Sequence, residues 1–318
     1  MITVIIPVKN GEATLSKCLA AIKNQTIADN IEIIILDTQS TDTSLQIAKT
    51  FGAKTINILP SDFNHGLTRN LGTQCANGEL VYFTVQDAYL AENNQLEKMA
   101  AHFVDEELQA VVGMQAVPND ADKNPAKWFK RFTAPFPEIR HFHPATPFKS
   151  LSPKQQFELS NWDNVNAMYR KSALQKIPFF KTNLSEDWLW ANAALHSGMK
   201  LIRDPSLVVY HYHHMFFGYA FRSVFVLVYH FYIFFNQLPE ITWSPVSTLR
   251  AVYAIIKQDK ISFAKKSYWI VHNVAASFAG FLSILVFRAA FAFNGKPLVE
   301  KAYKLICREI PQGLQKTR

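Results

Sequence analysis

The first ninety residues alternate between short apolar, β-branched runs and amphipathic stretches, and this alternation constrains the fold more than any other feature. The runs of strand length are 2–8, 31–36, 53–59 and 80–85, and the helical stretches are 13–24, 40–49 and 68–76. Strands that alternate with helices form a mostly parallel sheet with helices on both faces. The sequence therefore predicts an α/β fold whose ligands bind beyond the carboxyl ends of the strands.

The α/β pattern continues to about residue 215. Residues 119–160 are rich in Pro, Lys and aromatic side chains without a clear period, and we expect a long irregular excursion there. A helix at 185–197 and a strand at 201–211 follow. These features predict a first domain that covers residues 1–215.

The last third of the chain is apolar and predicts a helical region at 216–318. Residues 216–235 and 269–293 are each long enough to span a bilayer, although internal Arg and His side chains make a full span costly. Abundant Phe and Tyr with nearby lysines favour a helix or helical hairpin that lies on a membrane surface. A soluble subdomain, a homodimer interface and two true spans are the alternatives.

Charge and cysteine content narrow the class of protein. The net charge of +8 suggests an anionic partner such as nucleic acid, a nucleotide or an anionic membrane, and the alternative is a basic surface that needs no partner. Nucleic acid is not expected, because the basic residues are scattered and no nucleic-acid motif is present. Cys18, Cys75 and Cys307 form no CxxC pair, which fits a reducing, cytoplasmic compartment. The apolar N-terminal run is too short for a signal peptide.

Carboxylates stand at the ends of two predicted strands. Asp37 follows one strand, with Asp42 five residues later, and could accept hydrogen bonds from a base or a ribose hydroxyl. Asp87 follows another strand and could bind Mg²⁺ or Mn²⁺ that bridges two phosphates. The alternatives are a turn-capping side chain for Asp37 and a solvated loop carboxylate for Asp87.

Two further segments carry candidate chemistry. Glu186 and Asp187 precede two tryptophans, and either carboxylate could act as a general base whose pKa the apolar rings raise. The alternative is a helix N-terminus that is enriched in acids to suit its dipole. His211 and His213 point the same way from an extended backbone, so one of them could complete a metal site with Asp87.

A loop-to-helix junction at residues 63–70 is a candidate anion site. His65 and Arg69 lie on either side of this junction, and a helix N-terminus with a nearby Arg binds anions well. The alternative is a capped helix that carries a surface Arg. The segment therefore remains open between a phosphate contact and a structural cap.

Taken in order, these segments resemble the family-2 inverting glycosyltransferases, which have the GT-A fold. The matching segments are Thr3 to Asn10, the D-x-x-S-T-D run at 37–42, Gly78-Glu79-Leu80 leading to Gln86-Asp87-Ala88, and the Glu186-Asp187 pair. Residues 63–70, together with 86–88, look most like the rhamnosyltransferase-like branch. There are two departures: Val85 replaces the first Asp of the usual D-x-D metal motif, and Gln39 stands where Gly is common.

The resemblance implies a role for each matched residue. Asp187 would be the general base, with Glu186 nearby, and Asp87 would hold a divalent metal, Mg²⁺ or Mn²⁺, with His211 or His213. Asp37 would contact the donor base and Asp42 would support that pocket, while Arg69 or His65 would meet the diphosphate or the sugar. The residues expected around the donor are Pro7, Asn10, Asp37, Asp42, His65, Arg69, Gln86 and Asp87.

The implied activity is transfer of a sugar with inversion of its configuration, from a nucleotide-sugar donor to a glycan or lipid-linked acceptor in surface polysaccharide synthesis. The favoured donor is dTDP-rhamnose, and UDP-hexoses are the runner-up. A non-catalytic scaffold that binds nucleotide sugars is the alternative from another class. The expected location is the cytoplasm, at the inner face of the cell membrane.

Overall fold

The computed structural model describes residues 1–118, 120, 122–127, 136–142, 148–182, 185–241 and 245–307. The chain divides into two compact units, one of Met1–Ala116 with Arg131–Tyr212 and one of Val117–Lys130 with His213–Arg318. Sequence patterning predicts a boundary at 215, and it does not reveal that residues 117–130 belong with the C-terminal part. Asn124 belongs there because its side chain exchanges hydrogen bonds of 3.0 Å with the side chain of Asn273.

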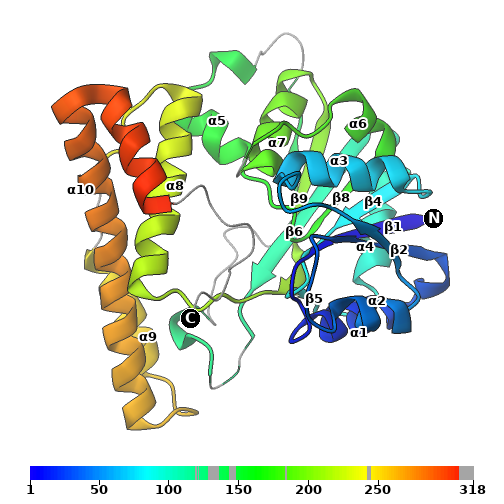
Figure 1. Cartoon of the computed structure of the whole chain (residues 1–318), viewed down its shortest axis with the longest axis horizontal. Coiled ribbons are helices and arrows are strands. Elements are labelled where there is room, and N and C mark those ends of the chain that lie inside the picture. Colours follow the sequence, from blue (N-terminus) through cyan, green and yellow to red (C-terminus); the bar gives the residue numbers. More distant parts are fainter. Residues whose placement is uncertain are drawn as a thin grey trace. The chain divides into compact units, whose positions relative to one another are not determined.

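Within the described residues, nine strands form one sheet in the first unit, in the order β3-β2-β1-β4-β8-β6-β9-β5, with β7 paired to β9 (Figure 1). The strands are β1 (Ile2–Val8), β2 (Ile31–Asp37), β3 (Lys54–Asn57), β4 (Leu80–Phe83), β5 (Tyr89–Leu90), β6 (Leu108–Ala116), β7 (Glu138–Arg140), β8 (Ala167–Arg170) and β9 (Lys200–Tyr210). Strands β1 to β4 are parallel to one another, as are β6 and β9. The sheet is nevertheless mixed, because β8 lies antiparallel between β4 and β6.

Helices cover both faces of this sheet (Figure 1). The helices of this unit are α1 (Leu15–Lys23), α2 (Ser44–Thr50), α3 (His65–Cys75), α4 (Gln95–Ala101), α5 (Pro153–Leu159), α6 (Lys171–Lys176) and α7 (Glu186–His196), of which α5 packs on α7. Side chains alternate along β1, so Val4 and Ile6 face the core formed with α1, whereas Ile5 faces the core that contains Trp190 of α7. The predicted α/β architecture with flanking helices is therefore confirmed.

Several element boundaries differ from those expected from sequence. Helix α2 begins at Ser44 rather than at residue 40, because residues 40–42 form a loop that hydrogen-bonds to the loop after β1. Helix α3 begins at His65 rather than at residue 68, because the side chain of Asn64 caps Leu67 N–H. The expected irregular excursion contains β7 and α5 among its described residues, and α5 starts with a capping box at Ser152.

The described part of the second unit is helical. It contains α8 (Phe217–Phe235), α9 (Pro245–Ile256) and α10 (Phe263–Cys307), and α10 breaks at Asn294 and Gly295, where the backbone angles are non-helical. The apolar helical C-terminal region is thus confirmed. Among the described residues, α8 and α10 are long and apolar enough to cross a membrane by length and composition.

Candidate active site

The carboxyl end of β2 carries a buried carboxylate. Asp37 is the last residue of β2 and is 1% exposed, and its Oδ2 accepts a hydrogen bond of 3.0 Å from Ser40 N–H. Its Oδ1 and the neighbouring Thr38 Oγ1 are buried without a hydrogen-bond partner among the described residues. A buried polar atom costs free energy until it is paired, so Asp37 and Thr38 are suited to pair with a bound ligand.

Two loops beside Asp37 are tied together by side chains. Asn10 donates its backbone N–H to Ser40 Oγ (2.9 Å), and Asn10 Oδ1 accepts from Thr41 N–H (2.9 Å). Asp42 Oδ2 accepts from Glu12 N–H (3.0 Å). Gln39, where glycine is common in the family, adopts a left-handed backbone with φ of 51°. Asn10 and Asp42 therefore hold the shape of the loops around Asp37.

Gln86 and Pro7 lie at the same end of the sheet. Gln86 Oε1 accepts a 2.8 Å hydrogen bond from Lys9 N–H, and Gln86 Nε2 donates to Lys9 O at 3.2 Å. Pro7 lies on β1 opposite Leu36, next to the end of β2. Because both amide atoms of Gln86 bond to the backbone of Lys9, this side chain fixes the loop that follows β1.

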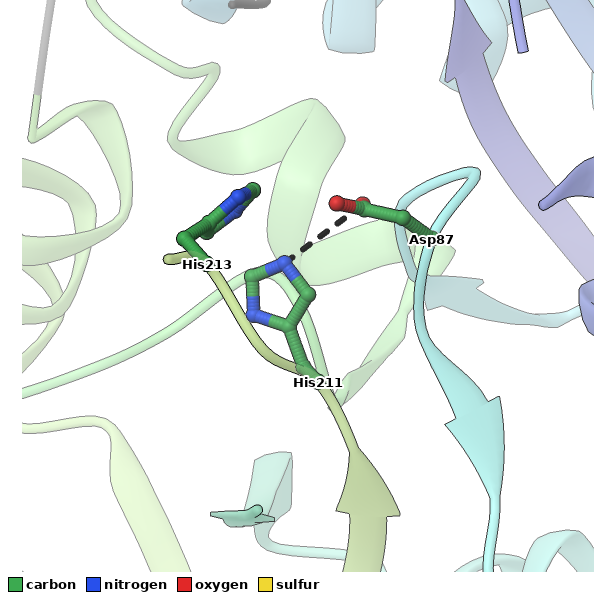
Figure 2. Close-up of side chains that lie close together, drawn as sticks. All are labelled: Asp87, His211 and His213. Atoms are coloured by element: carbon green, nitrogen blue, oxygen red, sulfur yellow. Dashed lines mark ion pairs between the residues drawn. The ribbon is translucent and has the colours of Figure 1, made fainter. Parts of the chain in front are cut away.

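A carboxylate and two imidazoles converge beside β9. Tyr89 pairs with Tyr210, which places Asp87 next to His211, and Asp87 Oδ1 lies 3.4 Å from His211 Nε2 (Figure 2). One ligand atom each of Asp87, His211 and His213 lies within 4.8 Å of the other two. His213 begins the C-terminal segment of the second unit, and covalent linkage through Tyr212 keeps it near His211. The Asp87 carboxylate is the donor that suits Mg²⁺ or Mn²⁺, and the two imidazole nitrogens add donors that divalent transition metals accept, so this set is compatible with the expected divalent metal.

Glu186 and Arg69 form a buried ion pair. Arg69 Nη1 lies 2.6 Å from Glu186 Oε1, and the same guanidinium nitrogen donates to His65 O at 3.2 Å. Glu186 also accepts from Asn164 Nδ2 at 3.2 Å. Although burial opposes ionisation, Arg69 and His65 hold the pKa of Glu186 below its usual value. Arg69 is therefore buried and not exposed at the surface, and its positive charge is paired with Glu186.

Asp187, the expected base, differs from its neighbour in its electrostatics. Its Oδ2 accepts from Asn164 N–H (3.1 Å), and its Oδ1 accepts from Trp188 N–H (2.7 Å). Burial raises the pKa of Asp187 well above its usual value, and the negative charges of Glu186 and Asp163 add to the rise. One carboxylate is thus held ionised while the other holds its proton more tightly, which is the pattern of a counter-ion beside an acid–base group.

His65 lies at the start of α3, close to this pair. Burial and the positive charge of Arg69 lower the pKa of His65 to about 4, against the opposing influence of Glu186. Its imidazole is therefore neutral at physiological pH and can contact a ligand as a hydrogen-bonding group but not as a cation.

Sequence reasoning missed three polar residues of this site: Gln115, Asp163 and Asn164. Asn164 contacts both Glu186 and Asp187, and Gln115 contacts both His211 and Asp163. Gln115 could have been found, since it lies one residue before the end of the apolar strand β6, much as Asp37 lies at the end of β2. Asp163 and Asn164 lie in a loop without regular structure that has no comparable signal in the sequence.

Known proteins resemble this chain over most of its length. The family model for glycosyl transferase family 2 matches residues 3–178, which is just over half of the 318 residues. The chain belongs to glycosyl transferase family 2. The O-antigen chain rhamnosyltransferase WbaN of Salmonella anatum is 30% identical to this family member over 290 residues, which cover 88% of this chain and 87% of the relative. RfbN of Salmonella typhimurium, with the same description, is 30% identical over 288 residues, with 88% and 87% covered.

Solved structures of glycosyltransferases share the fold of this family-2 member. Staphylococcus aureus TarS (residues 1–349, complexed with UDP) gives a TM-score of 0.53 at 15% identity, covering 98% of this chain and 81% of that chain. The mannosyltransferase PcManGT of Pyrobaculum calidifontis, complexed with GDP-Man and Mn²⁺, gives 0.54 at 17%, with 97% and 84% covered. The GT-A fold and the assignment as a glycosyltransferase that uses a nucleotide-sugar donor are thus confirmed.

Proposed function

We propose that the chain transfers rhamnose, with inversion and with the help of a divalent metal, from dTDP-rhamnose to a glycan or lipid-linked acceptor in surface polysaccharide synthesis. The sugar is supported by the likeness to two O-antigen chain rhamnosyltransferases across nearly nine-tenths of the chain. A UDP-hexose is the second donor class, because TarS has been solved with UDP and with UDP-GlcNAc.

The observation that carries the catalytic part of the proposal is the contrast between Glu186 and Asp187. Asp187 has a raised pKa and so attracts a proton strongly, as a general base for an acceptor hydroxyl should. Glu186 keeps its negative charge beside Arg69 and is the counter-ion rather than the base. A non-catalytic scaffold would have no need for two adjacent carboxyl groups with opposite pKa shifts.

The mechanism follows from these assignments. Asp187 takes the proton of the acceptor hydroxyl as the oxygen attacks the anomeric carbon, and the nucleoside diphosphate leaves from the opposite face. Asp37 binds the donor base through its buried Oδ1, within loops held by Asn10 and Asp42. Asp87, His211 and His213 would hold a Mg²⁺ or Mn²⁺ ion, whose positive charge would offset the negative charge that develops on the leaving diphosphate. His65 offers a neutral imidazole to the diphosphate or the sugar.

A donor-hydrolysis screen tests this function. Purified protein is offered dTDP-rhamnose, UDP-glucose, UDP-galactose and UDP-N-acetylglucosamine with Mn²⁺ or Mg²⁺, and released nucleoside diphosphate is measured. Metal-dependent release from dTDP-rhamnose that is lost in Asp187→Asn and Asp87→Ala is the expected result. Release of nucleoside diphosphate from a UDP-hexose alone would contradict the proposal that dTDP-rhamnose is the donor. If no donor is hydrolysed, calorimetric titration decides, because a protein that binds none of them is not a transferase of this class.

We further propose that the second unit lies on an anionic membrane surface through α9 and the start of α10. Exposed apolar side chains recur along both helices at helical spacing: Val246, Leu249, Tyr253 and Ile256 on α9, and Val271, Val274 and Phe278 on α10. Lysines lie at and near the turn between the two helices: Lys257, Lys260, Lys265 and Lys266. Apolar stripes with flanking lysines suit the interface of a bilayer that contains anionic lipid.

Vesicle flotation with the full chain tests the membrane surface. The wild type should float with phosphatidylcholine vesicles that contain phosphatidylglycerol, and much less with phosphatidylcholine alone. Lys260→Glu with Lys265→Glu should remove most of this binding, while the exposed Lys23→Glu on α1 serves as the matched control. Vesicle binding that does not depend on lipid charge, or a stable dimer that does not bind vesicles, would contradict the proposal. Resistance to carbonate extraction would favour true spans instead.

A further inference from the structure

A chain of hydrogen bonds begins at His211 and leads away from Asp87. Gln115 lies near the end of β6, and the parallel register pairs it with Val209 and pairs Ala116 with Tyr210 on β9. The backbone N–H of His211 continues this pairing with a 3.0 Å hydrogen bond to Ala116 O. The sheet thus brings the side chains of Gln115 and His211 together, with 2.6 Å between Gln115 Oε1 and His211 Nδ1.

The other end of the Gln115 amide is fixed by Asp163. Gln115 Nε2 donates a hydrogen bond to Asp163 Oδ2, and Asp163 Oδ1 accepts from Val165 N–H at 2.9 Å. An ionised carboxylate only accepts hydrogen bonds, so the amide must turn its NH₂ group toward Asp163. Its carbonyl oxygen then faces His211 and can only accept. The proton of the neutral imidazole therefore resides on Nδ1, and Nε2 keeps its lone pair.

We infer that Gln115 is a positioning residue that orients His211 so that Nε2 is the ring nitrogen presented to the metal, and that Asp163 orients Gln115 for this task. The inference rests on the proposed metal-dependent function. It is consistent with His211 Nε2 being the ring nitrogen that points toward Asp87, 3.4 Å away (Figure 2). Hydrogen bonds of this kind fix the tautomer and ring orientation of metal-binding histidines, and their loss weakens metal binding about 10- to 100-fold.

The same loop also reaches the expected base. Asn164, which follows Asp163, donates its backbone N–H to Asp187 and its side-chain N–H to Glu186. Residues 163 and 164 therefore orient a metal ligand through Gln115 on one side and the catalytic carboxyl pair on the other. A shift of this loop would disturb both parts of the site together.

Manganese binding tests the inference without any need for activity. Full-length protein without donor is titrated with Mn²⁺, and free Mn²⁺ is measured by electron paramagnetic resonance. Gln115→Leu should weaken binding about 10- to 100-fold. Gln115→Glu combined with Asp163→Asn should stay within about threefold of the wild type, because the carboxylate introduced at 115 still accepts from Nδ1–H and the amide introduced at 163 donates to that carboxylate. Gln109→Leu on the same strand is the matched control and should leave binding unchanged. Equal affinity of Gln115→Leu and the wild type would overturn the inference while leaving metal dependence intact.

The tautomer is measured directly on the wild-type protein, so the inference does not depend on a variant that folds. Full-length protein labelled with ¹⁵N-histidine is examined by NMR at pH 8 without metal, and His211 is assigned by comparison with His211→Gln. A protonated Nδ1 is expected, and a protonated Nε2 would overturn the inference. If the wild type binds no Mn²⁺, the metal part of the proposed function fails. The tautomer of His211 still tests whether Gln115 accepts a hydrogen bond from Nδ1.

Discussion

Arg69 and Glu186 are 117 positions apart in the sequence, yet their side chains meet at 2.6 Å and are only 5% and 6% exposed. The pair joins the second turn of α3, which contains Arg69, to Glu186, the first residue of α7. A buried charge without its partner is costly, so each of these residues depends on the other.

Removing one member of the pair should destabilise the protein strongly. We expect Arg69→Met to lower the free energy of unfolding by about 3–5 kcal/mol, because Glu186 would remain buried without its cation. Urea denaturation measures the change. Lys98→Met is the control: it breaks an ion pair with Glu92 whose side chains are about half exposed, and should cost under about 1 kcal/mol. Equal losses in the two variants would contradict the assignment of a buried pair.

The activity should depend on pH through Asp187. A general base must be unprotonated, so kcat/KM should fall as the pH drops through the raised pKa of Asp187, at a higher pH than an ordinary Asp would give. Asp187→Asn should lower kcat about 10²- to 10⁴-fold. Glu186→Gln should move the acid limb to lower pH, because it removes a negative charge that raises the pKa of Asp187 and keeps the charge of Arg69. An acid limb that stays in place would show that Glu186 does not influence the base.

Acid should destabilise the fold through His65. Its pKa is about 4 in the folded protein and about 6.5 when unfolded, so the unfolded state binds more protons between these values. Stability should therefore fall as the pH is lowered from about 6.5 to 4, by roughly 1.4 kcal/mol per unit of pKa difference. Denaturation curves at several pH values measure the slope. His65→Gln should flatten it, whereas His141→Gln, at an exposed position, should not.

Gly66 should not tolerate a side chain. A Cβ added there would lie 2.0 Å from the backbone oxygen of Phe180, because the start of α3 packs closely against this segment. Asn70 reinforces the contact by hydrogen-bonding to both the N–H and the O of Phe179. We expect Gly66→Ala to cost on the order of 2 kcal/mol or more, measured by thermal unfolding. Gly218→Ala, where no atom lies within 4 Å, should be neutral or slightly stabilising.

The periodicity of apolar residues along the sequence predicts several strands and helices of this protein. The strands at β1, β2 and β4 were predictable because each is a short apolar run that two helical layers bury. Asp37 was predictable as a candidate site residue because ligands collect where parallel strands end. The apolar helices α8 and α10 were predictable from their length and composition.

Other features were decided by tertiary structure alone. Strand β8 is too short to show its antiparallel direction, and β7 lies inside a segment without a clear period. The pairing of Arg69 with Glu186, and the chain from Asp163 through Gln115 to His211, join residues that are distant in sequence. Periodicity reports which face of an element is buried, because that depends on near neighbours. It cannot report which polar side chains meet inside, because that depends on how distant elements cross, and burial then sets which groups carry charge.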